Sequence, residues 1–529
     1  MQIETISLFN RENIKVFANR PNTIHSFFKE TVKKFKDKPA LISEETVFTY
    51  EELDQLSDRI ATNLQHLCGV VKGDRVGVVV GNSSEFPLIV LACSKLGAIM
   101  VPINVKLSAD EMDYIIGHSK PKVLIYEEEF KEKISALKKS GSAVLPKEQN
   151  IFVIKGSNSF EKILAETDQH YETNVSEEDS AYILYTSGTT GKPKGAVLSH
   201  VNVIHSVLSY TRVFKTDHTL KTIIAVPMFH VTGLVGQLLH LFYVGGTVYS
   251  MRRYQNEEYI HRIQENKINF LFNVPTIFIM MFTSKEFQKY NFDFVKKVAF
   301  GGAAIYKQTF QMLKEAFPNA TLHNAYGSTE TTSPATLMPT HYPVTKVSSV
   351  GLPVEVAEIK VINGEGNECK IGESGELYIR GPMVVKEYWD NPQANLSSFE
   401  DGYWKSGDIG FIDEDGYVFI RDRKKDMINR AGEKIFSVEV EDVLKNHPDV
   451  VEAAVVGVPD PIFGERVKAF VVGPNLNPRD FSPLKEYCLK YLAKFKVPEE
   501  FELIESLPRN AAGKILKNTL KEVGGMKHA

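Results

Sequence analysis

Between about residues 48 and 300, helix-like stretches alternate with short apolar runs, such as those at 75–80, 121–126 and 221–227. These runs do not alternate between apolar and polar residues, as a strand with one face in water does. Continuous apolar runs are typical of buried strands in parallel sheets. The pattern therefore predicts an α/β fold with layers of largely parallel strands.

One helix start is visible in the sequence. Thr49 stands three residues before Glu52, which is the spacing of a capping box, where each side chain bonds the other residue's backbone N–H. Apolar residues then follow at helical spacing; they are Leu53, Leu56, Ile60 and Leu64. We expect a helix that begins near Tyr50.

From residue 350 to 420 the chain changes to short apolar stretches interrupted by glycine, which predicts a β-rich subdomain with hairpin turns. The polar, charged segment 421–435 follows, and a new helical pattern begins near Val438. Such a segment is typical of a linker between domains. The expected organisation is a large N-terminal domain at 1–421, made of layered α/β subdomains plus the β-rich one, and a small α/β domain at 422–529.

Composition and charge narrow the class of protein. The 529 residues carry a formal charge of −4 with both signs mixed along the chain, so we expect no nucleic-acid partner. The 4 cysteines form no C-x-x-C pair and are expected to be reduced, mostly buried thiols. The N-terminus does not resemble a signal peptide, and no uncharged apolar run reaches the roughly 18 residues of a transmembrane helix. These features predict a cytoplasmic enzyme with no transmembrane segment.

The sequence YTSGTTGKPKG at 185–195 is rich in glycine, hydroxyl side chains and lysine. Backbone and hydroxyl donors of this kind can converge on phosphate. The spacing is not that of a P-loop, because Gly188 and Gly191 lie too close together and Pro193 follows Lys192. Since the loop directly follows an apolar run, we interpret it as a ligand site, with a flexible surface turn as the alternative.

A second candidate site is the segment NAYGSTETT at 324–332. Tyr326 is suited to stack on a base, Thr329 to reach a phosphate, and Glu330 to hold Mg²⁺, which prefers hard oxygen ligands. Taken alone, a capped loop with a solvated glutamate explains the segment equally well.

Two single residues also attract attention. Asp408 ends the segment GYWKSGD, and its two oxygens suit a ribose diol, although a turn aspartate is the ordinary interpretation. Lys514 follows a glycine near the C-terminus, where a solvated lysine is the ordinary interpretation.

Taken together and in this order, the motifs resemble the adenylate-forming superfamily of acyl-CoA synthetases, luciferases and nonribosomal-peptide adenylation domains. The resemblance extends over essentially the whole chain. The motifs that carry it are FTYEELDQLSDRIA, KLGAIMVPIN, YTSGTTGKPKG, PMFHVTG, NAYGSTE, GYWKSGDIG, RDRKKDMI and PRNAAGK.

The resemblance implies a reaction in two steps. A carboxylate attacks the α-phosphate of ATP, pyrophosphate leaves, and a thiol then attacks the acyl-adenylate. Because carboxylate and triphosphate repel each other, cations and oriented dipoles must neutralise the developing charge. The implied cofactor is Mg²⁺, with ATP and coenzyme A as co-substrates; a homodimer is compatible with the resemblance.

The resemblance also assigns site residues. The loop would bind the β- and γ-phosphates through Thr186, Ser187, Gly188, Thr189, Thr190 and Lys194, and Thr186 and Glu330 would arrange the Mg²⁺. The remaining nucleotide contacts would come from Gly302, Ala303, Asn324 and Tyr326 at adenine, Thr329 at the α-phosphate, and Asp408 and Arg423 at the ribose.

Lys514 corresponds to the family's adenylation lysine, whose compact ammonium group bridges the incoming carboxylate and the α-phosphate. In this family the mobile C-terminal domain rotates before thioester formation and removes the lysine from the site. The hinge corresponds to Lys425, and Gly432 would then leave room for a pantetheine arm.

The acid is less directly indicated. His230 matches a position of the family's acyl pocket, with a satisfied core histidine as the alternative. Relatives that activate coumarate commonly place Tyr and Ser shortly after this histidine, whereas this chain has Thr232 and Gly236, with Gly233 between them. The apolar segment 269–282 could line an acyl tunnel or belong to the core. These features favour a medium- or long-chain fatty acid.

Other interpretations of the function stay open at this stage. They are an aryl-acid or other small-acid CoA ligase, and a stand-alone adenylating enzyme that loads a carrier protein. A nucleotide-binding regulator without catalysis is a further alternative, but the joint presence of Glu330, Asp408 and Lys514 argues against it.

Overall fold

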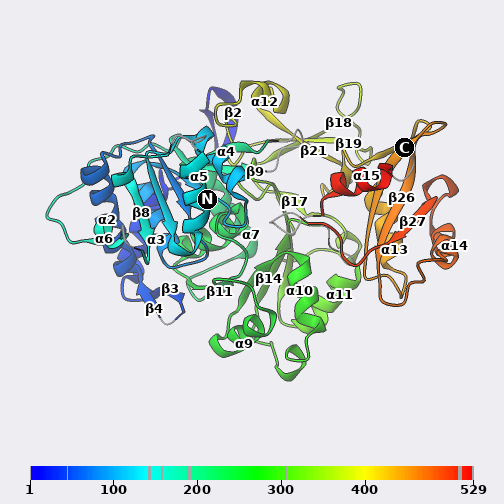
Figure 1. Ribbon diagram of the computed structural model, residues 1–529, viewed down its shortest axis with the longest axis horizontal. Coiled ribbons are helices and arrows are strands. Elements are labelled where there is room, and N and C mark those ends of the chain that lie inside the picture. Colours follow the sequence, from blue (N-terminus) through cyan, green and yellow to red (C-terminus); the bar gives the residue numbers. More distant parts are fainter. Residues whose placement is uncertain are drawn as a thin grey trace. The chain divides into compact units, whose positions relative to one another are not determined.

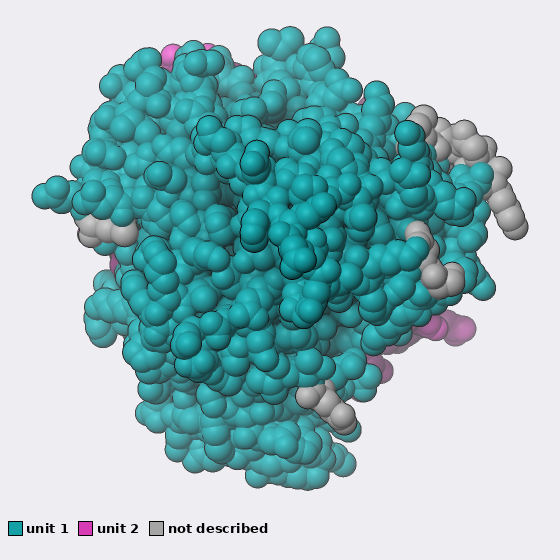
Figure 2. Space-filling model, turned by 90° about the vertical axis from the view of Figure 1, so that its left-hand side faces the viewer, with its two compact units in different colours: residues 1–359, 379–404 teal, residues 360–378, 405–529 magenta. Residues whose placement is uncertain are grey.

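The computed structural model describes residues 2–44, 46–140, 145–156, 159–186, 192–303, 305, 307–509 and 515–526. The chain divides into two compact units, drawn in separate colours in Figure 2. Unit 1 comprises residues 1–359 and 379–404, and unit 2 comprises residues 360–378 and 405–529. Both mix helices and strands, so the predicted α/β class is confirmed.

Unit 1 contains a six-stranded sheet in the order β10-β9-β6-β5-β7-β8. Its neighbouring strands are parallel except for β9 and β10, which form an antiparallel pair. The apolar runs at 75–80 and 121–126 supply β5 and β7, as predicted. The strands are β5 (Arg75–Val79), β6 (Ile99–Pro102), β7 (Val123–Glu127), β8 (Ile151–Ile154), β9 (Ser180–Thr186) and β10 (Lys194–Ser199).

A second, nine-stranded sheet has the order β17-β16-β15-β14-β13-β11-β12-β3-β4. Its six central strands, from β15 to β3, are parallel. Of these, β3, β11 and β14 are labelled in Figure 1. The predicted run at 221–227 supplies β11. The strands are β3 (Pro39–Ser43), β4 (Thr46–Thr49), β11 (Lys221–Ile224), β12 (Thr247–Ser250), β13 (Phe270–Asn273), β14 (Lys297–Gly301), β15 (Thr321–Tyr326), β16 (Thr336–Leu337) and β17 (Leu352–Pro353).

Helices of unit 1 connect these strands and pack against them. They are α1 (Ile24–Phe35), α2 (Tyr50–Cys68), α3 (Glu85–Leu96), α4 (Ala109–Ser119), α5 (Lys131–Ser140), α6 (Glu161–Leu164), α7 (His200–Phe214), the π-helix η3 (Thr232–Leu239), α8 (His240–Val244), α9 (Asn256–Asn266), α10 (Pro275–Thr283), α11 (Lys307–Ala316) and α12 (Pro392–Ser398). A hairpin of β1 (Ile3–Leu8) and β2 (Arg11–Phe17) and the short strand β20 (Phe399–Glu400) complete the strands of this unit. Short 3₁₀ turns are η1 (Glu128–Phe130), η2 (Glu148–Asn150), η4 (Phe287–Lys289) and η5 (Val344–Lys346).

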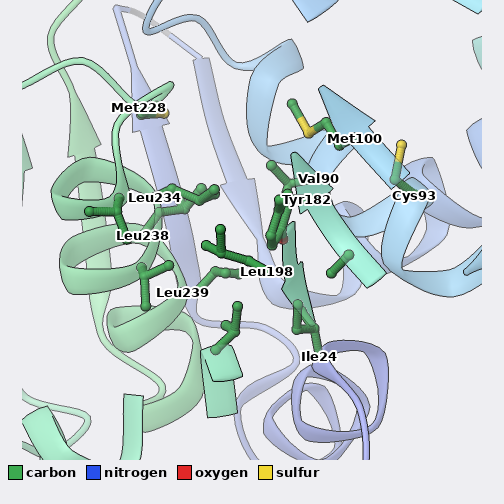
Figure 3. Close-up of a cluster of buried hydrophobic side chains, with 14 of the residues drawn as sticks. Ile24, Val90, Cys93, Met100, Tyr182, Leu198, Met228, Leu234, Leu238 and Leu239 are labelled. Atoms are coloured by element: carbon green, nitrogen blue, oxygen red, sulfur yellow. The ribbon is translucent and has the colours of Figure 1, made fainter. Parts of the chain in front are cut away.

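One buried apolar cluster joins the two sheets of unit 1 through the helices between them. It combines residues of the six-stranded sheet, such as Met100 and Tyr182, with Phe270 and Phe272 of the nine-stranded sheet. Figure 3 shows labelled members from α1, α3, β6, β9, β10 and η3, together with Met228. They are Ile24, Val90, Cys93, Met100, Tyr182, Leu198, Met228, Leu234, Leu238 and Leu239.

Helix α2 begins where the sequence predicts. The Thr49 hydroxyl accepts from the Glu52 N–H at 3.2 Å, and Glu52 Oε2 accepts from the Thr49 N–H at 2.8 Å. Gly69 caps the carboxyl end of the helix, and its φ of 64° lies in the left-handed region that suits glycine. The capping box and the predicted start are confirmed.

Unit 2 contains the predicted β-rich part and a smaller α/β part. Strands β18, β19, β21 and β22 follow one another in a sheet, with β21 and β22 forming a hairpin. A second sheet has the order β24-β23-β26-β25, with β27 beside β26. The strands are β18 (Glu358–Ile362), β19 (Gly375–Arg380), β21 (Tyr403–Ile412), β22 (Val418–Arg423), β23 (Ile428–Arg430), β24 (Glu433–Ile435), β25 (Glu452–Asp460), β26 (Gly464–Val472) and β27 (Glu500–Leu503).

The helices of unit 2 pack against two apolar clusters of the second sheet. One cluster is covered by α13 (Ser437–Lys445), α14 (Ser482–Tyr491) and η6 (Lys494–Lys496), and the other by α15 (Lys517–Met526). Helix α13 begins one residue before Val438, so this prediction is confirmed too.

The polar segment 421–435, expected to be a linker, has regular structure instead. Its residues form the end of β22, a turn, and the hairpin of β23 and β24. Asp422 is buried. Its Oδ2 accepts hydrogen bonds from both the backbone N–H and the hydroxyl of Ser437, the latter at 2.7 Å. The domain boundary at 421/422 and the hinge at Lys425 remain predictions.

Among the described residues, no helix is both long and apolar enough to cross a membrane. The cysteines are free; Cys68, Cys93 and Cys488 are buried, whereas Cys369 is partly exposed.

Two glycines of η3 have structural explanations. A Cβ on Gly233 would lie 2.6 Å from the carbonyl oxygen of Pro227, and one on Gly236 would lie 2.8 Å from Cε1 of Phe272. Both distances are shorter than ordinary contacts, so the helix lies too close to its neighbours for a side chain. Packing within the protein therefore accounts for both glycines.

We expect Gly236→Ala to destabilise unit 1 by about 1–3 kcal/mol, because the new methyl group overpacks a filled core. Phe272 cannot move freely, since its ring lies 5.7 Å from that of Tyr210, centroid to centroid. Urea denaturation measures the effect, and Gly236→Ala combined with Phe272→Leu should recover part of the stability. Gly364→Ala is the control, since a Cβ there has nothing within 4 Å. Wild-type stability of Gly236→Ala would contradict this account of the packing.

Candidate active site

The expected adenine contacts lie at the carboxyl end of the nine-stranded sheet. Strands β14 and β15 are parallel, with Gly301 opposite Ala325. Gly302 and Tyr326 are the next residues along the two strands, so the register places their backbones beside each other. Gly302 has a φ of 77°, which favours glycine, and both it and Ala303 are exposed. The carboxyl ends of parallel strands are where open α/β sheets bind ligands.

Asn324 also lies on β15, but part of its amide has a structural role. Its Nδ2 donates to the carbonyl oxygen of Ser349 at 3.1 Å, and the residue is buried. The side chain therefore fixes the neighbouring segment as well as lying near the expected adenine position.

A tight turn after β15 presents Thr329 and Glu330. The Thr332 N–H donates to the Thr329 carbonyl at 3.0 Å, and the Ala335 N–H donates to the Tyr326 carbonyl at 2.8 Å. These bonds close the turn on both sides of Glu330, so its position is set by backbone hydrogen bonds.

The Glu330 carboxylate is almost buried, with 9% of the residue exposed. Its Oε1 accepts a hydrogen bond of 2.9 Å from the Tyr388 hydroxyl, which in turn accepts from Trp404 Nε1 at 3.4 Å. Burial, first, and the nearby Glu330 carboxylate raise the pKa of Tyr388, so the phenol stays neutral. A neutral partner does not cancel the charge of the carboxylate, which fits a hard cation such as Mg²⁺.

Thr186 and Lys194 face each other where β9 and β10 meet the candidate phosphate loop. They are directly paired in the strand register, and the Thr186 hydroxyl lies 3.5 Å from the Lys194 carbonyl oxygen. The Lys194 ammonium group lies 5.0 Å from the centroid of the Tyr388 ring. Tyr388 thus connects the base of the loop to Glu330. The loop residues Ser187, Gly188, Thr189 and Thr190, and also Lys514, lie outside the described residues.

His230 follows β11 at the same carboxyl edge of the nine-stranded sheet. Its N–H donates to the Pro227 carbonyl at 3.1 Å, and its own carbonyl accepts from the Leu234 N–H at 2.9 Å. Its ring lies 4.8 Å from that of Phe229. The histidine therefore lies just before η3, which begins at Thr232.

In unit 2, the two expected ribose ligands are paired. Asp408 and Arg423 are opposite each other on β21 and β22, and Arg423 Nη1 donates to Asp408 Oδ1 at 3.0 Å. Asp408 is buried, with 7% exposed. Gly432 lies in the exposed turn between β23 and β24 with a φ of 91°, and a Cβ there would meet nothing within 4 Å.

Within the described part of the chain, no group of three or more His, Cys, Asp or Glu side chains could hold a metal ion. A cation held by Glu330 and Thr186 would therefore take its other ligands from phosphate and water, as Mg²⁺ commonly does in nucleotide sites.

Comparison with known proteins identifies the family of this chain. Residues 28–389 match the AMP-binding enzyme family, and residues 439–514 match the AMP-binding enzyme C-terminal domain. The chain belongs to this family, part of the adenylate-forming superfamily that the motifs indicated. It is an AMP-forming acid–thiol ligase that works through an acyl-adenylate.

Individual relatives differ in their acids. The chain is 35% identical to the fatty acid–[acyl-carrier-protein] ligase ScoC of Streptomyces coeruleorubidus, over 92% of this chain and 93% of that protein. It is 32% identical to the long-chain-fatty-acid–CoA ligase FadD13 of Mycobacterium tuberculosis, over 90% and 92% of the two chains. The solved structure of o-succinylbenzoate CoA synthetase (MenE) from Bacillus subtilis with ATP and a magnesium ion superimposes with a TM-score of 0.82 at 29% identity, covering 94% and 99%.

The sequence analysis missed Tyr388 and Trp404. Trp404 lies inside the motif GYWKSGD, where only Asp408 suggested a ligand contact. Tyr388 lies outside every quoted motif, and no local pattern indicates that its hydroxyl meets Glu330.

We expect Glu330→Gln to lower the rate of adenylation by about 10²-fold or more, because the amide keeps the shape but loses the charge that binds Mg²⁺. Pyrophosphate release across a series of Mg²⁺ concentrations measures this loss, and added acid substrate should not restore it. Glu358→Gln is a matched control, since Glu358 also accepts from a tyrosine, Tyr403, at 3.2 Å. Near wild-type activity of Glu330→Gln at ordinary Mg²⁺ would place the metal elsewhere.

Proposed function

We propose that this ligase activates a medium- or long-chain fatty acid as acyl-AMP and transfers the acyl group to coenzyme A, with release of AMP and pyrophosphate. The observation that carries the choice of acid is the apolar character of the segment that follows His230. Residues 228–239 contain no Lys, Arg, Asp or Glu.

The polar side chains of η3 support this choice. Gln237 is turned towards β11, where its Nε2 donates to the Thr222 hydroxyl at 3.2 Å. Thr232 is then the remaining polar side chain of η3 for a substrate. A second carboxylate or a phenol would lack partners along this helix, whereas an alkyl chain needs none. The names of ScoC and FadD13 point in the same direction.

The proposed division of labour follows the geometry. Lys194, Thr186 and the loop 187–191 bind the β- and γ-phosphates, and Thr186 with Glu330 holds Mg²⁺. When bound, the cation neutralises phosphate charge that would repel the incoming carboxylate.

The other assigned residues complete the proposed nucleotide site. Thr329 approaches the α-phosphate, and Tyr326 lies against adenine beside the backbone of Gly302 and Ala303. Asp408, with Arg423 beside it, accepts hydrogen bonds from the ribose hydroxyls, because a carboxylate offers two acceptor oxygens.

Lys514 and His230 are assigned to the reacting end of the acid. The lysine neutralises the carboxylate and the α-phosphate as they meet, and His230 lines the pocket near the carboxylate. For thioester formation, rotation at Lys425 brings Gly432 to the pantetheine arm. The boundary at 421/422, a cytoplasmic location and a homodimer stay predictions from the sequence.

A panel of acids tests the substrate. We expect kcat/KM for acids of about eight to sixteen carbons to exceed that for four-carbon acids by at least about tenfold, since each buried methylene adds about 1–3 kcal/mol of discrimination. Benzoate, cinnamate, 2-succinylbenzoate and oxalate complete the panel. AMP and thioester are measured with coenzyme A and with a phosphopantetheinylated carrier protein. A preferred aryl acid or dicarboxylic acid would refute the fatty-acid assignment, and transfer to the carrier alone would refute coenzyme A.

We expect Lys514→Ala to nearly abolish acyl-AMP formation, by about 10²- to 10³-fold, because one preorganised cation is lost. Thioester formation from supplied acyl-AMP should be largely spared, since the lysine leaves the site before that step. Single-turnover assays of the two half-reactions measure the difference. Equal losses in both would contradict the role given to Lys514.

A further inference from the structure

Residues 385–389 connect the base of the phosphate loop to the turn that carries Glu330. The Val385 N–H donates to the Glu330 carbonyl at 2.9 Å, and the Trp389 N–H donates to the Gly195 carbonyl at 2.7 Å. The segment therefore lies beside β10, to which an isolated antiparallel bridge between Tyr388 and Ala196 joins it, and Tyr388 lies between these two attachments.

The side chain of Tyr388 is fixed from several directions. The residue is 3% exposed, and its backbone N–H and carbonyl both bond the Asn395 amide, at 2.7 and 3.1 Å. The indole of Trp404 can only donate and the carboxylate of Glu330 only accept, so the phenolic hydrogen must point at Glu330. The orientation of this hydrogen bond is thus set by the chemistry of its two partners.

The ring of Tyr388 has a second neighbour. The Lys194 ammonium group lies 5.0 Å from the ring centroid, within the range of a cation–π interaction. One buried side chain therefore contacts both the carboxylate assigned to Mg²⁺ and the lysine assigned to phosphate.

We infer that Tyr388 is a positioning residue for adenylation, which holds Glu330 in one orientation for Mg²⁺ and places Lys194 for the phosphates. Partners that orient metal ligands in this way contribute strongly to metal affinity. The inference rests on the roles of Glu330 and Lys194 in the proposed function. It does not depend on which acid the enzyme activates.

The test is Tyr388→Phe, which removes the hydroxyl and keeps the ring beneath Lys194. We expect the Mg²⁺ concentration for half-maximal adenylation to rise about tenfold, with kcat at saturating Mg²⁺ little changed. A measurement without turnover accompanies it, in which Mn²⁺ is titrated into enzyme with a non-hydrolysable ATP analogue and followed by electron paramagnetic resonance. The Mn²⁺ affinity should fall by a similar factor.

Two further variants separate positioning from general stability. Tyr403→Phe removes another phenolic donor to a carboxylate of unit 1, Glu358, and should leave Mn²⁺ affinity unchanged. Trp404→Phe removes the donor to the Tyr388 hydroxyl and should weaken Mn²⁺ binding in the same direction but less. It also keeps the inference testable if Tyr388→Phe does not fold. Melting temperatures of all variants show whether a loss of metal affinity merely follows a loss of stability.

The outcomes distinguish this inference from the proposed function. If the wild type binds Mn²⁺ with the nucleotide and Tyr388→Phe binds it equally well, Tyr388 has no positioning role. If Tyr388→Phe does not fold, wild-type Mn²⁺ affinity of Trp404→Phe likewise shows that Tyr388 has no positioning role. If the wild type itself does not bind Mn²⁺ with the nucleotide, the metal role of Glu330 fails together with the inference. A failed acid panel with the expected Mn²⁺ shift would refute the fatty-acid assignment alone and support the role of Tyr388.

Discussion

The parallel register of the nine-stranded sheet is the constraint on which the candidate site depends. Because its central strands end at one edge, the segments after β11, β14 and β15 all begin there. A slip of one residue between β14 and β15 would separate Gly302 from Tyr326 and turn buried side chains to the opposite face. Apolar clusters on both faces oppose such a slip, because, of two successive residues of β14, Ala299 belongs to one cluster and Phe300 to the other. Core packing therefore sets the position of the residues that are expected to bind the nucleotide.

The second constraint on the candidate site is electrostatic. The reaction brings a carboxylate substrate to a triphosphate, and the site adds Glu330, a further negative group. An arginine or lysine paired with Glu330 would relieve the repulsion, but it would also reduce the attraction of the carboxylate for a cation. Tyr388 avoids this conflict because a neutral phenol satisfies one buried oxygen and cancels no charge. The positive charge of Lys194 is held by the ring face of the same residue.

Local signals made much of the fold predictable from the sequence. The capping box fixed the start of α2, and the apolar runs located β5, β7 and β11, because each signal lies within a few residues. Tyr388 could not be found in this way, since its hydroxyl meets a residue 58 positions away. The regular structure of the segment 421–435 was not predicted for a different reason: a buried, hydrogen-bonded aspartate such as Asp422 looks the same in a sequence as a solvated one.

Glycine raises a similar ambiguity in the acyl pocket. A glycine at position 236 shows that a side chain is missing, but the sequence does not show whether substrate or protein fills the space. Here the ring of Phe272 fills it, and that ring packs in turn against Tyr210, Phe214 and Phe270. An acyl chain that passed Gly236 would have to displace this ring, and part of its binding free energy would be lost in doing so. In the proposed function, selection among acids therefore begins nearer His230, because the packed ring of Phe272 opposes the passage of an acyl chain in this direction.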